Sequence, residues 1–200
     1  MVNTQGESYP TNVSSPRELV AKGVIIRSIL PTDNPNRLWD ISVRAMRAAD
    51  SRFAAIKNAT HVDFKDPYKF YKVDHGGGLC VAEVNGQIVG FGGFIKHPDQ
   101  NEILTCNIRR LRVDPEYQGL GIGQKIITKT EQMAIKMGYR VARLGTSNRN
   151  PAMIHLLSKN GYKTIKKKPE PEKGMGKDYI EYQFEKNLTG AVEHSLKTSL

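Results

Sequence analysis

Apolar residues recur along this chain with two different periods, and the change of period separates predicted strands from predicted helices. A run of mostly aliphatic residues, Val24–Leu30, predicts a first strand. Apolar positions then recur at helical spacing through Leu38, Ile41 and Ala45, which indicates an amphipathic helix. The following stretch, residues 53–70, is rich in lysine and aromatic residues and predicts either a weaker helix or a loop.

A β-hairpin is predicted next. Two strand-like runs, Leu79–Val84 and Gln87–Phe94, are separated by Asn85-Gly86. Asn-Gly between two such runs is the strongest short signal for a hairpin. Glycines among residues 90–93 leave one face of the second strand bare, so we expect a ligand or another strand to approach that face.

The second half of the chain alternates strands with helices. The predicted elements are a strand at 103–113, a helix ending at Gly138, a strand at 140–145, a helix at 150–159, and strands at 162–166 and 179–184. Hairpins followed by a strand–helix–strand–helix–strand section indicate an α/β (α+β) protein. They predict a mixed, mostly antiparallel central sheet of about seven strands with helices on both faces.

The two ends of the chain are polar. We expect residues 1–22 to form a flexible arm, residues 23–187 to form one folded domain, and residues 188–200 to form a polar tail. The first residues lack the basic start and apolar stretch of a secretory signal. No apolar run approaches the roughly 20 residues that span a bilayer. A cytoplasmic protein is therefore expected.

The charge balance is strongly basic, with 30 Lys and Arg against 20 Asp and Glu, a net charge of +10. This balance favours anionic ligands and non-specific adhesion to nucleic acid. The densest basic run, residues 163–168, has no interleaved aromatic residues and is better explained as a solvated face. The two cysteines, Cys80 and Cys106, each lie in a strand-like run and are expected to be buried thiols. No His/Cys/carboxylate cluster has the spacing of a zinc site, and no metal is expected.

The most informative motif is residues 107–127, Asn-Ile-Arg-Arg-Leu-Arg-Val-Asp-Pro-Glu-Tyr-Gln-Gly-Leu-Gly-Ile-Gly-Gln-Lys-Ile-Ile. Its alternating glycines, Gly119, Gly121 and Gly123, allow the backbone to approach a ligand closely. The helix that follows begins with unpaired N–H groups and the positive end of its dipole, which suits a phosphate.

Two common phosphate loops are excluded by spacing. A Walker A loop ends in Gly-Lys-Ser/Thr, whereas here Gln124-Lys125 is followed by Ile126. A dinucleotide fingerprint has its third glycine three positions after the second, and neither possible reading of this loop places a glycine there.

The remaining pattern, Gln118–Gly123 after a strand that ends in Leu-Arg-Val-Asp-Pro, resembles the acyl-CoA pyrophosphate loop of the GNAT N-acetyltransferase superfamily. A second stretch, residues 144–162, is similar to the strand, Asn, helix and Lys-x-Gly-aromatic section of that superfamily. The resemblance covers about residues 23–187 and does not identify a subfamily. It implies the GNAT acyl-CoA N-acyltransferase fold and acetyl-CoA as the acyl donor.

The resemblance also implies which residues hold acetyl-CoA. Main-chain groups of the strand would pair with pantetheine, and amides of the loop would hold the pyrophosphate. Asn150 would touch the pantetheine arm or position the acetyl group, although a helix N-cap explains it equally well. The implied residues are Leu111, Arg112, Val113, Gln118, Gly119, Leu120, Gly121, Ile122, Gly123, Gln124 and Asn150.

Three positions that often carry the catalytic acid or base in this superfamily are occupied by Asn107, Gly145 and Leu157 here. The general base therefore has to be sought elsewhere, and a backbone N–H near the end of the fourth strand can stabilise the oxyanion without a side chain.

Three other residues are candidates for the missing catalytic groups. Glu102 and His155 are the nearest candidate bases, with a solvated loop charge and a surface histidine as the alternative interpretations. Tyr162 is a candidate proton donor to the thiolate, with a core aromatic residue as the alternative.

Taken together, the sequence predicts an acyltransferase, a GNAT-type N-acetyltransferase that moves an acetyl group from acetyl-CoA to a primary amine by direct attack. Basic and aromatic residues between 31 and 78 would suit an anionic or ring-bearing acceptor, although helices covering the sheet would show the same composition. An acyl-CoA-binding module or sensor without turnover is the alternative, and a nucleic-acid partner rests on charge alone. The oligomeric state stays open, with a homodimer as one alternative.

Overall fold

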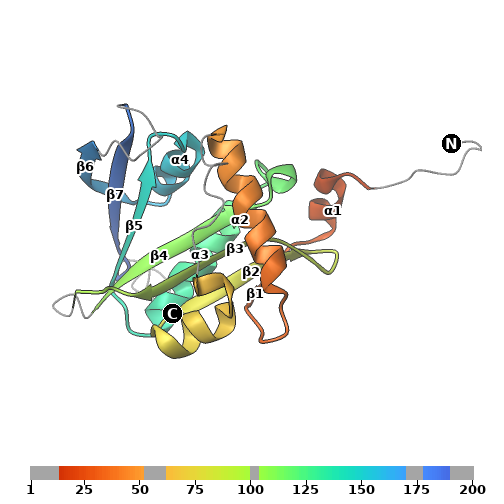
Figure 1. The fold of residues 1–200 in the computed structure, drawn as a ribbon, viewed down its shortest axis with the longest axis horizontal. Helices are drawn as coiled ribbons and strands as arrows, with labels where there is room; N and C mark the ends of the chain where they lie inside the picture. Colours follow the sequence, from red (N-terminus) through yellow and green to blue (C-terminus); the bar gives the residue numbers. More distant parts are fainter. Residues whose placement is uncertain (1–13, 52–61, 100–103, 170–177, 190–200) are drawn as a thin grey trace, which may run out of the picture.

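The computed structural model of the protein describes residues 14–51, 62–99, 104–169 and 178–189. At its centre lies one seven-stranded sheet with the order β1-β2-β3-β4-β5-β7-β6 (Figure 1). Neighbouring strands are antiparallel except for β4 and β5, which are parallel. The predicted mixed, mostly antiparallel sheet is therefore confirmed.

The elements follow the chain in the predicted order. The strands are β1 (Ile25–Ser28), β2 (Gly78–Val84), β3 (Gln87–Lys96), β4 (Thr105–Val113), β5 (Val141–Ser147), β6 (Lys163–Pro169) and β7 (Ile180–Asn187). The helices are α1 (Pro16–Lys22), α2 (Pro35–Ala49), α3 (Ile122–Lys136) and α4 (Pro151–Lys159), with short helical turns η2 (Val62–Phe64), η3 (Lys69–Asp74) and η4 (Pro115–Tyr117).

Helix α1 lies within the stretch for which the sequence indicated a flexible arm. The Ser15 side chain accepts a hydrogen bond from the Glu18 amide, and the Glu18 carboxylate accepts one from the Ser15 amide, which makes a capping box. Leu19 and Val20 pack against the core. Residues 1–13 of the expected arm and residues 190–200 of the expected tail lie outside the described residues.

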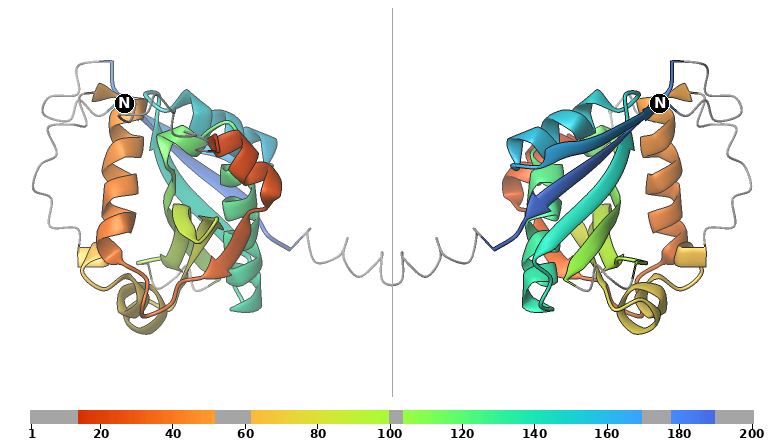
Figure 2. Two further views of the ribbon diagram at one scale, coloured as in Figure 1. Left: turned by 90° about the vertical axis from the view of Figure 1, so that its right-hand side faces the viewer. Right: turned by 90° about the vertical axis from the view of Figure 1, so that its left-hand side faces the viewer.

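The two faces of the sheet carry different helices. Helix α3 covers one face, and α2 with η2 and η3 covers the other, as Figures 1 and 2 show from three directions. Side chains of β2 alternate between the two resulting cores: Cys80 and Ala82 belong to the core under α3, and Leu79 and Val81 belong to the core under α2. The nearly continuous apolar run at residues 79–84 thus corresponds to a strand that is buried on both faces.

The bare face of β3 is covered by helix α3, and not by a ligand or another strand as the sequence suggested. A Cβ atom built at Gly92 would lie 2.6 Å from Ile126 Cγ2, and one built at Gly90 would lie 2.9 Å from Ile126 Cδ1. The glycines therefore let α3 pack closely against the sheet. This close packing fixes where the N-terminus of α3 lies.

Both cysteines are buried free thiols, as predicted. Cys80 Sγ lies 3.4 Å from the Gly92 carbonyl oxygen and 3.5 Å from Thr130 Oγ1. Desolvation raises the pKa of the Cys106 thiol to about 12. A thiol in that state is not a nucleophile at neutral pH.

One buried carboxylate joins α2 to the end of β4. Asp114 is 1% exposed, and its Oδ2 atom accepts hydrogen bonds of 3.0 Å from both Arg37 and Arg44 of α2. Its main-chain N–H also donates to the Val89 carbonyl at 2.8 Å. Because Asp114 directly follows β4, this ion-pair network holds α2 over the end of that strand.

We predict that Asp114→Ala lowers the free energy of unfolding by about 2–3 kcal/mol, because it removes charge-assisted hydrogen bonds from a buried acceptor. The matched control is Glu116→Gln, since Glu116 binds the same Arg44 with a side chain that is 62% exposed. That change should cost less than about 1 kcal/mol. Urea unfolding of the two variants measures the difference, and equal losses would contradict a structural role for Asp114.

Candidate functional site

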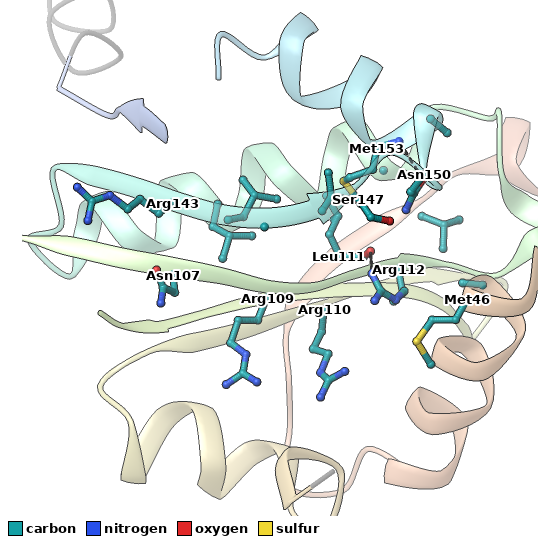
Figure 3. Close-up of a pocket in the computed structure, with 18 of the residues that line it drawn as sticks. Met46, Asn107, Arg109, Arg110, Leu111, Arg112, Arg143, Ser147, Asn150 and Met153 are labelled. Carbon is teal, nitrogen blue, oxygen red and sulfur yellow. Dashed lines mark hydrogen bonds between the residues drawn. The ribbon is translucent and has the colours of Figure 1, made fainter. Parts of the chain in front are cut away.

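A cleft opens where β4 and β5 part. The two parallel strands pair over only three positions, Thr105↔Val141, Cys106↔Ala142 and Asn107↔Arg143, and no later pair of the described residues continues the ladder. The cleft has a volume of about 940 Å³, within the usual range for a small-molecule site (Figure 3). Main-chain groups on the facing strand edges are therefore left for a ligand to bind.

A β-bulge in β4 shapes one wall of this cleft. The register with β3 shifts between Phe91↔Arg112 and Gly93↔Arg109, and Arg110 has a φ of 57°. Positive φ is costly for a residue with a side chain and needs outside support. Asp63 supplies it, because its carboxylate accepts hydrogen bonds of 2.7 and 3.2 Å from the Arg110 guanidinium.

The glycine-rich loop lies at one end of the cleft, before helix α3. Gly119 and Gly121 have φ values of 73° and 79°, and a Cβ at either position would meet nothing within 4 Å. The amides of residues 119–124 donate no hydrogen bond to any described part of the chain. Six consecutive N–H groups without a partner among the described residues, at a helix N-terminus, are an arrangement that suits a phosphate anion.

Side chains close the loop against the strand. Gln118 Nε2 donates to the Val113 carbonyl at 3.0 Å, and Arg112 Nη1 donates to the Leu111 carbonyl at 3.0 Å. These are the carbonyl groups that face the cleft at the end of β4. A ligand that pairs with them as an added strand would have to displace the two side chains.

Asn150 caps helix α4, so the N-cap interpretation is confirmed. Its side-chain oxygen accepts from the Met153 amide at 3.1 Å, and Pro151 follows at the first helical position. Asn150 also lines the cleft (Figure 3). Its amide nitrogen has no hydrogen-bond acceptor among the described residues and remains available to a ligand.

The profile of the acetyltransferase (GNAT) family matches residues 41–162, which is more than half of the chain. The matched region contains β4, the glycine-rich loop, α3, β5 and α4.

The chain belongs to the GNAT family.

Curated proteins resemble part of the chain. An uncharacterized N-acetyltransferase of Methanocaldococcus jannaschii is 33% identical over 89 residues, covering 42% of this chain and 38% of that protein. The human N-acetylaspartate synthetase is 27% identical over 110 residues, covering 55% of this chain and 35% of that protein. The matched stretches thus span less than two fifths of these relatives' own lengths.

Solved structures match over most of the chain. An acetyltransferase of the GNAT family from Staphylococcus aureus Mu50 superposes with a TM-score of 0.66 at 20% identity, covering 83% of this chain and 99% of that one. The structure of yncA from Salmonella typhimurium with its cofactor acetyl-CoA gives 0.65 at 22% identity, covering 82% and 94%. These likenesses confirm the predicted GNAT acyl-CoA N-acyltransferase fold.

The residues that the GNAT resemblance implied for acetyl-CoA divide into two groups. Leu111, Arg112, Val113, Gln118, Gly119, Gly123 and Asn150 line the cleft. Leu120, Gly121, Ile122 and Gln124 lie on the adjoining loop and helix start without lining it. The Ile122 side chain is in the core, and Gln124 exchanges hydrogen bonds with the Asn160 amide, so these two residues have only main-chain amides to offer.

The candidate catalytic residues are not brought together beside the cleft. Glu102 lies outside the described residues. His155 is exposed on α4 and does not line the cleft. Tyr162 is 4% exposed in the core under α3, where burial and the nearby Glu131 carboxylate raise the pKa of its hydroxyl. Their catalytic roles stay predictions without support from position.

A carboxylate that the sequence did not single out does face the cleft. Glu181 of β7 lies opposite Ser147 of β5 and lines the cleft. A Cβ atom built at Gly145 would lie 3.1 Å from Glu181 Oε1. The Glu181 carboxylate therefore occupies the space above a position that often carries the base in GNAT proteins.

Four arginines also line the cleft. Arg109, Arg110 and Arg112 come from β4 and Arg143 from β5 (Figure 3). Arg143 pairs with Glu185 at 2.7 Å, and Arg110 with Asp63. Arg109 and Arg112 make no ion pair with another described residue.

The described part of the chain contains no group of three or more metal-binding side chains close together. Its helices are all too short or too polar to cross a bilayer.

Proposed function

We propose that this protein transfers an acetyl group from acetyl-CoA to a primary amine by direct attack of the amine on the thioester. The observation that carries this proposal is the run of free amides at residues 119–124, placed at the end of the cleft between β4 and β5. Membership of the GNAT family and the fold shared with yncA, which holds acetyl-CoA, support the donor.

In this proposal, acetyl-CoA binds chiefly through main-chain groups. The pyrophosphate lies on the amides of residues 119–124, and the positive end of the α3 dipole stabilises its charge. The pantetheine arm lies along the edge of β4 as an added strand, beside Leu111 and Val113. The free amide nitrogen of Asn150 donates to a pantetheine carbonyl from the other side of the cleft.

The acetyl transfer needs two proton movements. The acceptor arrives as an ammonium ion and loses one proton to a base, so that its lone pair can form the C–N bond to the thioester carbon. A main-chain N–H near Val113 stabilises the resulting oxyanion. The C–S bond then breaks, sulfur leaves with the electron pair, and a second proton passes from the nitrogen to the thiolate.

Glu181 is the residue we propose as the base. Its carboxylate stands over Gly145, half-buried, and makes no ion pair with another described residue. Arg143 of the same face is already paired with Glu185, so that arginine does not neutralise Glu181. A carboxylate at this position can accept the proton of an ammonium ion that enters the cleft.

Binding of acetyl-CoA without turnover is the second candidate function, and the residues at the three usual catalytic positions favour it. Asn107, Gly145 and Leu157 cannot act as acid or base there. Measurement of free CoA thiol with a panel of amines separates the two functions. Steady release with any amine supports transfer, whereas a thermal shift with acetyl-CoA and no release supports binding alone.

We predict that acetyl-CoA at about 100 times its dissociation constant stabilises the protein by about 2.7 kcal/mol in thermal unfolding. Gly121→Ala should weaken binding about 5- to 30-fold, because a residue with a side chain disfavours the left-handed conformation by about 1–2 kcal/mol and the amides around it then turn away. Calorimetric titration measures the affinity of both proteins.

The matched control is Gly138→Ala. Gly138 has a φ of 92° and open space at Cβ, but it lies past the opposite end of α3. This change should lower stability by a similar amount and leave the affinity for acetyl-CoA unaltered. Equal affinities of the two variants would contradict the proposed pyrophosphate site.

We predict that Glu181→Gln lowers kcat/KM by about 10²- to 10⁴-fold, because the acceptor must then lose its proton without a base. The deficit should narrow at alkaline pH, where more of the acceptor is already the free amine. Affinity for acetyl-CoA should not change. The control is Glu185→Gln, which removes a carboxylate from the same face of β7 outside the cleft.

Moving the carboxylate to the neighbouring strand also tests whether Glu181 is the base, because the moved group should restore part of the lost rate. Gly145→Glu combined with Glu181→Ala returns an acid to the same space from the neighbouring strand, because the atom nearest to a Cβ at position 145 is the Glu181 carboxylate oxygen. Partial recovery of the rate over Glu181→Ala alone is expected. If Glu181→Gln retains the parent rate at neutral pH, the assignment is wrong.

A further inference from the structure

The bulge in β4 gathers guanidinium groups on one face of the sheet. In a regular strand successive side chains point to opposite faces. Here Ile108 and Leu111 belong to the core under α3, and the left-handed conformation of Arg110 inserts an extra residue between them. Arg109, Arg110 and Arg112 consequently all point to the side of α2, as Figure 3 shows.

Among the described residues, Asp63 is the carboxylate that pairs with these arginines, and its partner is Arg110. Asp63 accepts both hydrogen bonds from Arg110 and a third, of 3.3 Å, from the Tyr71 hydroxyl. Neither Arg109 nor Arg112 makes an ion pair with any described residue. Two positive charges on the wall of the cleft are therefore left without a counter-charge from the described part of the chain.

Arg112 is the more unusual of the two. Its Nε atom is buried and donates to no acceptor, while Nη1 reaches only the carbonyl of the adjacent Leu111. Burial, with a smaller effect of the Arg110 charge, lowers the pKa of the Arg112 guanidinium to about 10. A buried cation without a partner is costly, and an anionic ligand would remove that cost.

The acetyl-CoA phosphates do not explain this cluster under the proposed function. The pyrophosphate site is built from the amides of residues 119–124 at the start of α3, whereas the arginine side chains leave β4 towards α2 (Figure 3). The side of the cleft next to α2, lined by Ala45 and Met46, is where the acceptor has to enter.

We propose that the acceptor amine carries a carboxylate, which Arg112 and Arg109 bind on the α2 side of the cleft. This inference rests on the proposed function and assigns the substrate to the class of amino-acid-like zwitterions. Glu181 of β7 faces the same cleft with the opposite charge. The protein therefore offers a carboxylate for the ammonium group and guanidinium groups for the carboxylate, which polyamines and neutral amines cannot use together.

The test compares amino acids with their α-carboxamides, which keep the amine and side chain and lose the negative charge. Release of CoA thiol is measured for each pair with the full chain and acetyl-CoA. We expect kcat/KM to fall about 30- to 3,000-fold on amidation, because the buried guanidinium loses its charged partner. Spermidine and a lysine-containing peptide should be poor acceptors.

Variants of the two arginines test whether they cause the preference for acids over amides. Arg112→Gln and, more weakly, Arg109→Gln should reduce the acid-to-amide ratio of kcat/KM, whatever their effect on the rate with the amide. Arg112→Lys keeps the charge without the planar pair of donors and should retain part of the ratio. Arg47→Gln is the control, since Arg47 is exposed on α2 outside the cleft. A retained thermal shift with acetyl-CoA shows that each variant is folded.

If no amine releases CoA, the binding of amino acids can be measured instead by thermal unfolding. In the presence of CoA, the amino acids should raise the melting temperature of the parent protein, and the amides should not. Such a result would reject acetyl transfer and keep the anion site. Amides or polyamines that bind or react as well as the acids would overturn the anion site and leave the acetyltransferase proposal standing.

Discussion

The functional architecture depends on the early parting of two parallel strands. β4 and β5 pair over three positions and then diverge, so main-chain groups beyond that point have no partner on the facing strand. Backbone groups inside a fold are nearly always paired, and here the Arg112 and Gln118 side chains pair with the Leu111 and Val113 carbonyls, while other contacts hold the strands apart. Here Asp63 holds the bulge of β4 and Asp114 holds its end, each through ion pairs with arginine. The cleft is thus maintained by two buried carboxylates that lie outside the ligand's path.

Main chain and side chains have separate tasks in the resulting site. The proposed phosphate site consists of main-chain amides, and it requires glycines that can adopt left-handed conformations. The proposed acceptor site consists of cleft-lining side chains from β4, β7 and α2. A protein built in this way can keep one donor while the acceptor changes, because substitutions at Arg109, Arg112 or Glu181 leave the amide cradle intact. This division is consistent with a shared fold among neighbours that are only 20–22% identical to this chain.

The main-chain part of the site could be predicted from the sequence better than the side-chain part. Local features were predictable: the Asn85-Gly86 turn has the two positive φ values that its residues favour, and the glycine loop precedes α3 as expected. Contacts that depend on distant residues were not. Arg110 adopts its conformation because of Asp63, 47 residues away. Glu181 reaches Gly145 because β7 inserts between β5 and β6, a strand order that no local pattern encodes. Local sequence signals therefore predict turns and helix starts, but not contacts that depend on the order and register of distant strands.

Under the proposed function, acetyl-CoA and the acceptor bind to different parts of the cleft and therefore do not compete for the same donors. A free anion could bind either to the amides at the start of α3 or to the arginines of β4, since both offer unpaired donors. The two sets of donors differ in how far they extend from the backbone. The fixed amides suit a compact phosphate group that lies against the backbone. The guanidinium groups suit a planar carboxylate that is held away from it. Because the amides lie at the start of α3 and the arginines on β4, the proposals above would let a diphosphate and a carboxylate bind at the same time. Glu181 then lies on the side of β7, where the ammonium group of an acceptor anchored by its carboxylate can reach it.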